Sequence, residues 1–131
     1  MSYGIGESAA QPGVATPSLS IRALDLTRGL PAIGLGVEVL PDRDYSQFSI
    51  ETNNDGRTDQ PLLEGPPFPS GQCKLRFAIG KFFALNRSWP PNTSSEWLDI
   101  VPVQFDAAVE VRHLHVAMLM TPNSYTAYRG S

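Results

Sequence analysis

The sequence predicts an all-β fold, a two-sheet antiparallel β-sandwich with one short helix. Apolar and polar residues alternate along short segments, as they do in strands that bury one face of a sheet. Turns that contain glycine or proline separate these segments at regular intervals, which is typical of sandwiches. Only residues 81–86, which precede Pro90-Pro91, favour a helix, of about one to two turns.

Each predicted strand follows from its alternation or from the turns that flank it. The first strand begins near Ser18 and is followed by the turn Arg28-Gly29-Leu30-Pro31. Asn53-Asn54-Asp55-Gly56 is a strong turn signal after the third strand, and the four prolines of 59–70 predict a loop. In chain order, the predicted strands are 18–23, 33–39, 45–52, 73–79, 97–105, 109–120 and 125–128.

The length of 131 residues predicts one domain, 18–131, after a flexible tail, 1–17, that is rich in Gly, Ser, Ala and Pro. A net charge of −3 argues against nucleic-acid or membrane-surface partners. The single cysteine, Cys73, is expected to be packed and inert, and it favours a reducing compartment. The start lacks a signal-peptide pattern. We expect a cytoplasmic protein, with the peroxisome as the alternative.

The alternation also predicts which side chains point away from the core. In 109–120, the better core face is Leu114, Val116, Met118 and Met120, so His113 and His115 should point out of the sandwich. Arg22 likewise lies opposite the apolar residues of the first strand. A site on such an outer face would need walls from a partner subunit, because a lone sheet face is open to water.

Ordinary structural interpretations of these residues stay open. A His-X-His pair on a strand is more often a solvated face than a catalytic or metal site. As a metal site it lacks a third ligand, and only Asp25 or Glu110 could be offered. Asp55-Gly56-Arg57 reads on composition alone as a turn followed by a solvated arginine. No metal or cofactor motif is present in the sequence, and none is expected to be needed.

Several motifs, taken together, resemble the transthyretin-like family, and specifically its enzymatic branch, the 5-hydroxyisourate hydrolases. The resemblance runs from about Leu19 to Ser131 and is weak between Leu63 and Asp106. The last motif is the most specific, and it suggests that the chain end is itself part of a site. The motifs are 19–25 (LSIRALD), 28–32 (RGLPA), 52–59 (TNNDGRTD), 113–116 (HLHV), 119–122 (LMTP) and 128–131 (YRGS).

The resemblance implies a homotetramer with active sites in a channel where outer sheet faces meet. It implies hydrolytic opening of a urate-derived heterocyclic ring by histidine-activated water. His115, Arg57 and Ser131 match the family's catalytic residues; Tyr128, Arg129 and Gly130 frame the serine and are expected to bind substrate. His115 can take a proton near neutral pH, Arg57 can hold an anion or oxyanion, and the Ser131 hydroxyl can donate a hydrogen bond.

Arg22 departs from the enzymatic branch, which has a catalytic histidine at this position, whereas the carrier branch has a lysine. An arginine cannot act as a base, because it does not lose its proton at accessible pH. Ala117 also replaces a usual proline. Three hypotheses follow: a hydrolase with His115 as sole base and Arg22 as a further anion-binding residue; a repurposed paralogue that opens, cyclises or rearranges another polar heterocycle; and a non-catalytic small-molecule binder.

Overall fold

The computed structural model describes residues 18–41, 47–64, 72–86, 97–106 and 113–130, and these form a β-sandwich with one short helix. The predicted tail, 1–17, and Ser131 lie outside the described residues. No helix in the described part is long and apolar enough to cross a membrane. The elements are β1 (Ser18–Asp25), β2 (Leu30–Pro31), β3 (Gly36–Pro41), β4 (Phe48–Glu51), β5 (Leu63–Glu64), β6 (Gln72–Ala78), α1 (Ile79–Leu85), β7 (Ile100–Asp106), β8 (His113–Met120) and β9 (Tyr125–Gly130).

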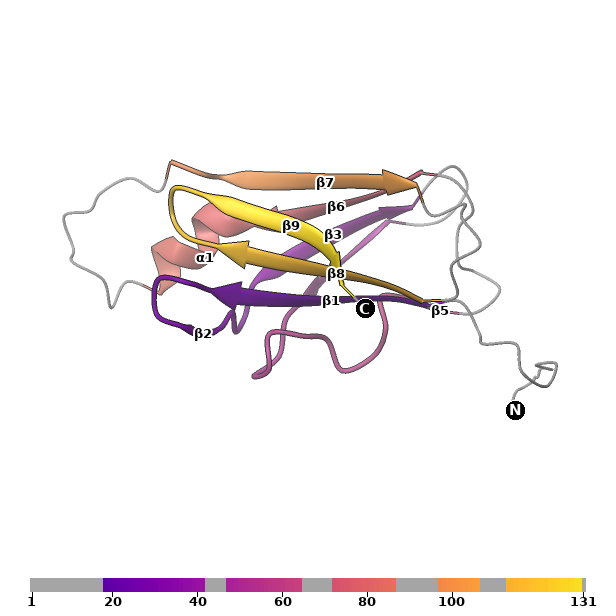
Figure 1. Ribbon diagram of the computed structural model, residues 1–131, viewed down its shortest axis with the longest axis horizontal. Coiled ribbons are helices and arrows are strands. Elements are labelled where there is room, and N and C mark those ends of the chain that lie inside the picture. The colour runs from indigo at the N-terminus through magenta and orange to yellow at the C-terminus, as the bar shows by residue number, and fades with distance from the viewer. Residues whose placement is uncertain (1–17, 42–46, 65–71, 87–96, 107–112, 131) are drawn as a thin grey trace, which may run out of the picture.

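The strands form two sheets that pack face to face (Figure 1). One sheet has the order β2-β1-β8-β9, with β5 paired to the other end of β1, and the second has the order β4-β3-β6-β7. Every pairing is antiparallel except that of β1 with β8, which is parallel. The parallel pair joins the two strands that carry Arg22 and the histidines, and it therefore fixes how these side chains are spaced.

The core lies between the sheets and confirms the predicted alternation. Leu19, Ile21 and Ala23 of β1 are buried, while Arg22 is exposed. On β8, the four residues of the predicted core face are also buried. Cys73 is packed in the same core, and burial raises the pKa of its thiol to about 11, so the group stays protonated at neutral pH.

The segment around Ile33 differs from the prediction, which placed it in a strand that continues to Val39. Ile33 lies in an exposed turn, and β3 begins only at Gly36. The buried hydroxyl of Thr52 fixes this turn, because it donates to the carbonyl of Ala32 at 2.5 Å and accepts from the N–H of Leu35 at 2.9 Å. The backbone therefore bonds to Thr52 here instead of continuing a strand.

Several other elements differ from the prediction in extent, for example β7, which begins only at Ile100 instead of residue 97. The predicted loop 59–70 contains the two-residue strand β5, and its part beyond Glu64 lies outside the described residues. The helix begins at Ile79, two residues before its predicted start, and Asn86 follows it. The Asn86 amide donates to the carbonyl of Phe82 at 2.8 Å, which satisfies a carbonyl of the last turn.

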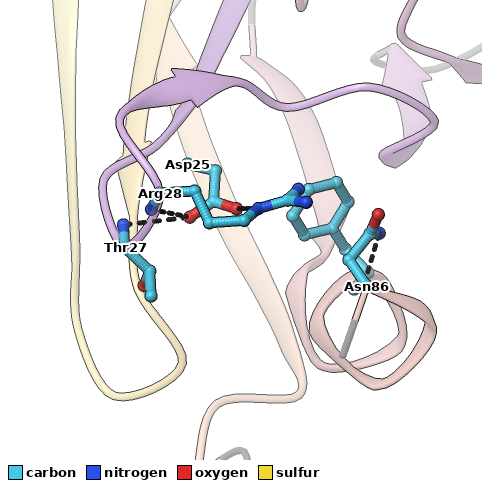
Figure 2. A network of polar contacts seen from close by, with 5 residues as sticks. Asp25, Thr27, Arg28 and Asn86 are labelled. Atoms are coloured by element: carbon cyan, nitrogen blue, oxygen red, sulfur yellow. Dashed lines mark hydrogen bonds and ion pairs between the residues drawn. The ribbon is translucent and has the colours of Figure 1, made fainter. Parts of the chain in front are cut away.

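Asp25 ends β1 in a buried network of polar contacts (Figure 2). Its carboxylate accepts the backbone N–H groups of Thr27 at 2.9 Å and Arg28 at 3.3 Å, and the Arg28 side chain at 2.7 Å. Because its side chain is 0% exposed and already bonded, Asp25 is not available as a metal ligand. The described residues contain no cluster of three or more His, Cys, Asp or Glu that could hold a metal ion.

Candidate active site

The outer face of the β1-β8-β9 sheet carries the polar residues that the sequence predicted to point away from the core. The strand registers align Ser20 with His115 and His115 with Gly130 in one row. The adjacent row contains Arg22, Ala117 and Tyr128. Residues about a hundred positions apart in the sequence are thus neighbours on this sheet, because β1 and β8 pair in parallel.

His115 is half-buried at the centre of this face. Its Nδ1 forms a hydrogen bond with the Ser20 hydroxyl at 2.7 Å. Partial burial lowers the pKa of His115 below the ordinary value of 6.5. The charges of Arg57, His113 and Arg22 lower this pKa further, in that order. The imidazole is therefore neutral at pH 7 and can accept a proton.

The lack of a side chain at Gly130 leaves room for the imidazole of His115 beside β9. A Cβ added at Gly130 would lie 2.8 Å from Cδ2 of His115, closer than real side chains approach. The ring thus occupies the space that a side chain at position 130 would need. The glycine of the Tyr-Arg-Gly-Ser motif therefore has a steric role that follows from the geometry of His115.

Arg57 reaches the same region through a tight turn. Asn53 holds this turn, since its backbone N–H donates to the carbonyl of Arg57 at 2.7 Å and its side chain accepts the N–H groups of Asp55 and Arg57. Gly56 has a φ of +72° and lies against β1, where its carbonyl accepts the N–H of Ala23 at 2.8 Å. The turn is therefore bonded to β1 one residue beyond Arg22.

Arg22 and Arg57 bring two exposed guanidinium groups to the site. Neither forms an ion pair within the part of the chain that the structure describes. Both lie close enough to His115 to lower its pKa. Two permanent positive charges without an acidic partner favour an anionic ligand, and a guanidinium can bind a carboxylate or oxyanion with paired hydrogen bonds.

Tyr128 and Arg129 lie on opposite sides of β9. Tyr128 aligns with Ala117 on the outer face, where its side chain is half exposed. Arg129 aligns with Val116, a core residue, and therefore belongs to the row that faces the other sheet. It lines a cavity of about 290 Å³ that His115 and Tyr128 also line, together with Val103, Phe105, Leu114, Val116 and Ala127. Arg129 thus lies on the opposite side of β9 from Tyr128, but it shares this cavity with His115.

Ser131, which ends the predicted site, lies outside the described residues. The preceding residue, Gly130, aligns with His115. Among the residues expected to form the site, those that share one region of the molecule are His115, Arg22, Arg57, Gly130 and Tyr128, and Arg129 lines a cavity with His115 and Tyr128.

The sequence did not reveal the serines of β1 as part of the site. Ser18 and Ser20 bond to His113 and His115, respectively, at 2.6 and 2.7 Å. The available signal was the matching two-residue spacing of Ser-X-Ser and His-X-His. It becomes informative only when β1 and β8 are known to be neighbours in register.

Both the sequence and the fold of this chain match known proteins. Residues 19–130 match the model of the HIUase/Transthyretin family. A 5-hydroxyisourate hydrolase of Deinococcus radiodurans is 36% identical over 118 residues, which cover 88% of this chain and 97% of the relative. The sequence similarity therefore extends over almost the whole length of this relative.

Two solved structures show the same fold. The structure of an (S)-allantoin synthase matches with a TM-score of 0.77 and 30% identity, over 90% of this chain and 45% of that chain, so this chain spans about half its length. Sea bream transthyretin in complex with thyroxine matches with a TM-score of 0.74 and 24% identity, over 86% of this chain and 94% of that chain. The second likeness concerns the fold alone. From the family match and the hydrolase relative together, the chain belongs to the HIUase/Transthyretin family.

Proposed function

We propose that this protein is a hydrolase that opens the ring of 5-hydroxyisourate, or of a closely similar anionic heterocycle, by adding water to a ring carbonyl. The observation that carries the proposal is the combination of His115 with two guanidinium groups, that of Arg22 on the same sheet face and that of Arg57 on the adjoining turn, neither of which forms an ion pair within the described residues. The hydrolase relative, at 36% identity, supports the choice of substrate.

His115 is the proposed general base. Its lowered pKa keeps the imidazole neutral at pH 7, and Nδ1 already bonds to Ser20, so Nε2 is the nitrogen left for the substrate. Nε2 takes a proton from water as the water oxygen bonds to the ring carbonyl carbon. The carbonyl oxygen becomes an oxyanion, which the guanidinium of Arg57 stabilises.

The ring opens when this oxyanion collapses. The carbon–nitrogen bond of the ring breaks, and the imidazolium of His115 returns its proton to the departing nitrogen. The carbonyl carbon becomes a carboxylic acid, which ionises near neutral pH. Arg22 cannot exchange protons in this sequence, but its charge favours a product that has gained a carboxylate. We further propose that the Ser131 hydroxyl donates a hydrogen bond to the substrate.

The site also needs walls that one subunit does not supply. The outer face is a sheet surface on which Arg22 and Tyr128 are exposed, and Arg57 is exposed on the turn beside it. We propose that the same face of another copy covers it, within a homotetramer. Light scattering after size-exclusion chromatography should then give four times the chain mass, and a monomer that retains full activity would exclude shared walls.

Freshly prepared 5-hydroxyisourate tests the proposal. Its ultraviolet absorbance should decay faster in a stopped-flow mixture with the protein than in buffer. In water enriched in ¹⁸O, mass spectrometry should find one heavy oxygen in the new carboxylate. Decay at the buffer rate would contradict the substrate assignment. Faster conversion without ¹⁸O in the product would show rearrangement instead of hydrolysis.

Arg22 favours a second candidate, a repurposed enzyme that acts on another polar heterocycle. A permanent cation stands where the enzymatic branch is expected to have a titratable histidine, which changes the charge and the proton chemistry of the site. The substitution Arg22→His separates the two candidates. It should raise the rate with 5-hydroxyisourate many-fold if the site was retuned for another substrate, and lower that rate if Arg22 serves this one.

A further inference from the structure

A chain of hydrogen bonds runs through two serines and two histidines on the outer face of the β1-β8 pair. Nδ1 of His113 lies 2.6 Å from the Ser18 hydroxyl, and its Nε2 lies 3.4 Å from the Ser20 hydroxyl. The Ser20 hydroxyl in turn lies 2.7 Å from Nδ1 of His115. Ser20 therefore stands between the two imidazoles.

The parallel register explains why this chain forms. Ser18 aligns with His113 and Ser20 with His115, so serine and histidine face each other at two successive outward positions. The two imidazoles are nearly parallel, with 15° between their planes and 6.3 Å between their centroids. Each row therefore pairs a short side chain on β1 with a ring on β8.

The donors and acceptors of the chain must point in one direction. A serine hydroxyl has one proton, so Ser20 can donate to only one of the two imidazoles and accepts from the other. If Ser20 donates to Nε2 of His113, it accepts the Nδ1–H of His115. His113 then carries its own proton on Nδ1 and donates it to Ser18. Each of these three contacts has one donor and one acceptor.

The opposite direction would place the proton of a neutral His115 on Nε2. That tautomer has no lone pair on Nε2, and it could not take a proton from water there. Within the described residues, Nε2 of His115 has no hydrogen-bond partner. Only the first direction therefore leaves the free nitrogen able to act as a base.

We propose that Ser20 and His113 are positioning residues that hold neutral His115 as the Nδ1–H tautomer, with the lone pair of Nε2 directed to the substrate. This inference rests on the proposed function for its use, since it describes how the proposed base is prepared. The hydrogen-bond chain itself, however, can be tested without any substrate.

The test is side-chain ¹⁵N NMR of the full-length protein labelled at histidine, at about pH 8, where His115 is neutral. In the wild type, Nδ1 of His115 should show the shift of a protonated nitrogen and Nε2 that of an unprotonated one. Ser20→Ala should move the tautomer towards Nε2–H, and Ser20→Thr, which keeps the hydroxyl, should restore the wild-type shifts. His113→Ala, at an exposed position, is a second variant that should also move the tautomer.

Two NMR results would overturn the inference: Nε2–H in the wild type, or unchanged shifts in both Ser20→Ala and His113→Ala. Ser49→Ala is the matched control, because Ser49 is an exposed serine on β4 of the other sheet. The kinetic arm is separate. With 5-hydroxyisourate, Ser20→Ala should lower kcat by about tenfold with little change in KM.

The two arms separate failure of the inference from failure of the proposed function. A protein that has the expected tautomer but does not act on 5-hydroxyisourate would contradict the function and leave the positioning role intact. An active protein whose kcat is unchanged in Ser20→Ala would contradict the positioning role alone.

Discussion

The carbonyl of Gly56 accepts a hydrogen bond of 2.8 Å from the backbone N–H of Ala23. This hydrogen bond links the turn that carries Arg57 to the strand that carries Arg22. It explains how a loop residue and a strand residue come to place their guanidinium groups near His115. Strands supply the base and one cation, and a tight turn supplies the other.

Replacing Gly56 by alanine should therefore destabilise the protein strongly. A Cβ at Gly56 would lie 2.3 Å from the carbonyl oxygen of Ala23, and its φ of +72° is unfavourable for any other residue. Backbone would have to move, and we expect a loss of roughly 3 kcal/mol or more in the free energy of unfolding, measured in urea.

Gly29→Ala is the matched control for Gly56→Ala. Gly29 has a similar φ of +69°, but a Cβ there would meet nothing within 4 Å. It should lose only about 1 to 2 kcal/mol, the cost of the left-handed backbone alone. Equal losses in the two variants would show that the close approach to Ala23 contributes nothing.

Gly130→Ala should impair the site more than the fold. The added Cβ would meet Cδ2 of His115 at 2.8 Å, and the imidazole, which is only half-buried, can move away. We expect the rate of ring opening to fall by at least about tenfold, while the midpoint of thermal unfolding changes little. Gly36→Ala is the control, because its Cβ would make only an ordinary contact of 3.6 Å with Ala78. Full activity in Gly130→Ala would contradict the account of His115.

The pH dependence of activity should follow His115. Its pKa is lowered, so the active neutral form persists below pH 6.5, and kcat/KM should fall only as the pH drops through this lowered value. Removing a neighbouring cation stabilises the imidazolium, so Arg57→Gln should raise the pKa and move the fall in activity to higher pH. Arg22→Gln should act in the same direction but less, since its effect on His115 is smaller.

NMR titration of the His115 ring measures these pKa changes independently of activity. Arg76→Gln is a suitable control, because Arg76 lies on β6 of the other sheet and is paired with Glu38. A lower pKa in Arg57→Gln would contradict the electrostatic account.

Much of the fold was predictable because its signals are local. The alternation in β1 and β8 predicted which residues are buried, and it placed Arg22 and His115 on the outer face. The turn at Asn53–Gly56 was likewise visible in the residues themselves. The exposed turn at Ile33 was not, because it depends on the hydroxyl of Thr52, a contact across 20 positions.

The arrangement of the site was less predictable, because it depends on pairing between distant segments. No local pattern shows that β1 and β8 run parallel, and this pairing brings Ser20 to His115. The position of Arg57 depends on a hydrogen bond between Gly56 and Ala23. Arg129 was grouped with its motif neighbours; alternation places it on the opposite side of β9 from Tyr128, yet both line one cavity with His115.

The most direct test of the central claim is the rate at which His115→Gln and the wild type consume fresh 5-hydroxyisourate, measured by stopped flow at equal protein concentration. His115 is the proposed sole base, so its replacement by a side chain that cannot take up the proton should lower the rate by about 10² to 10⁴-fold. We expect the wild type to consume 5-hydroxyisourate well above the buffer rate, and His115→Gln to consume it at nearly the buffer rate. Equal rates for the two proteins would contradict the claim that this sheet face is a hydrolase site built around His115.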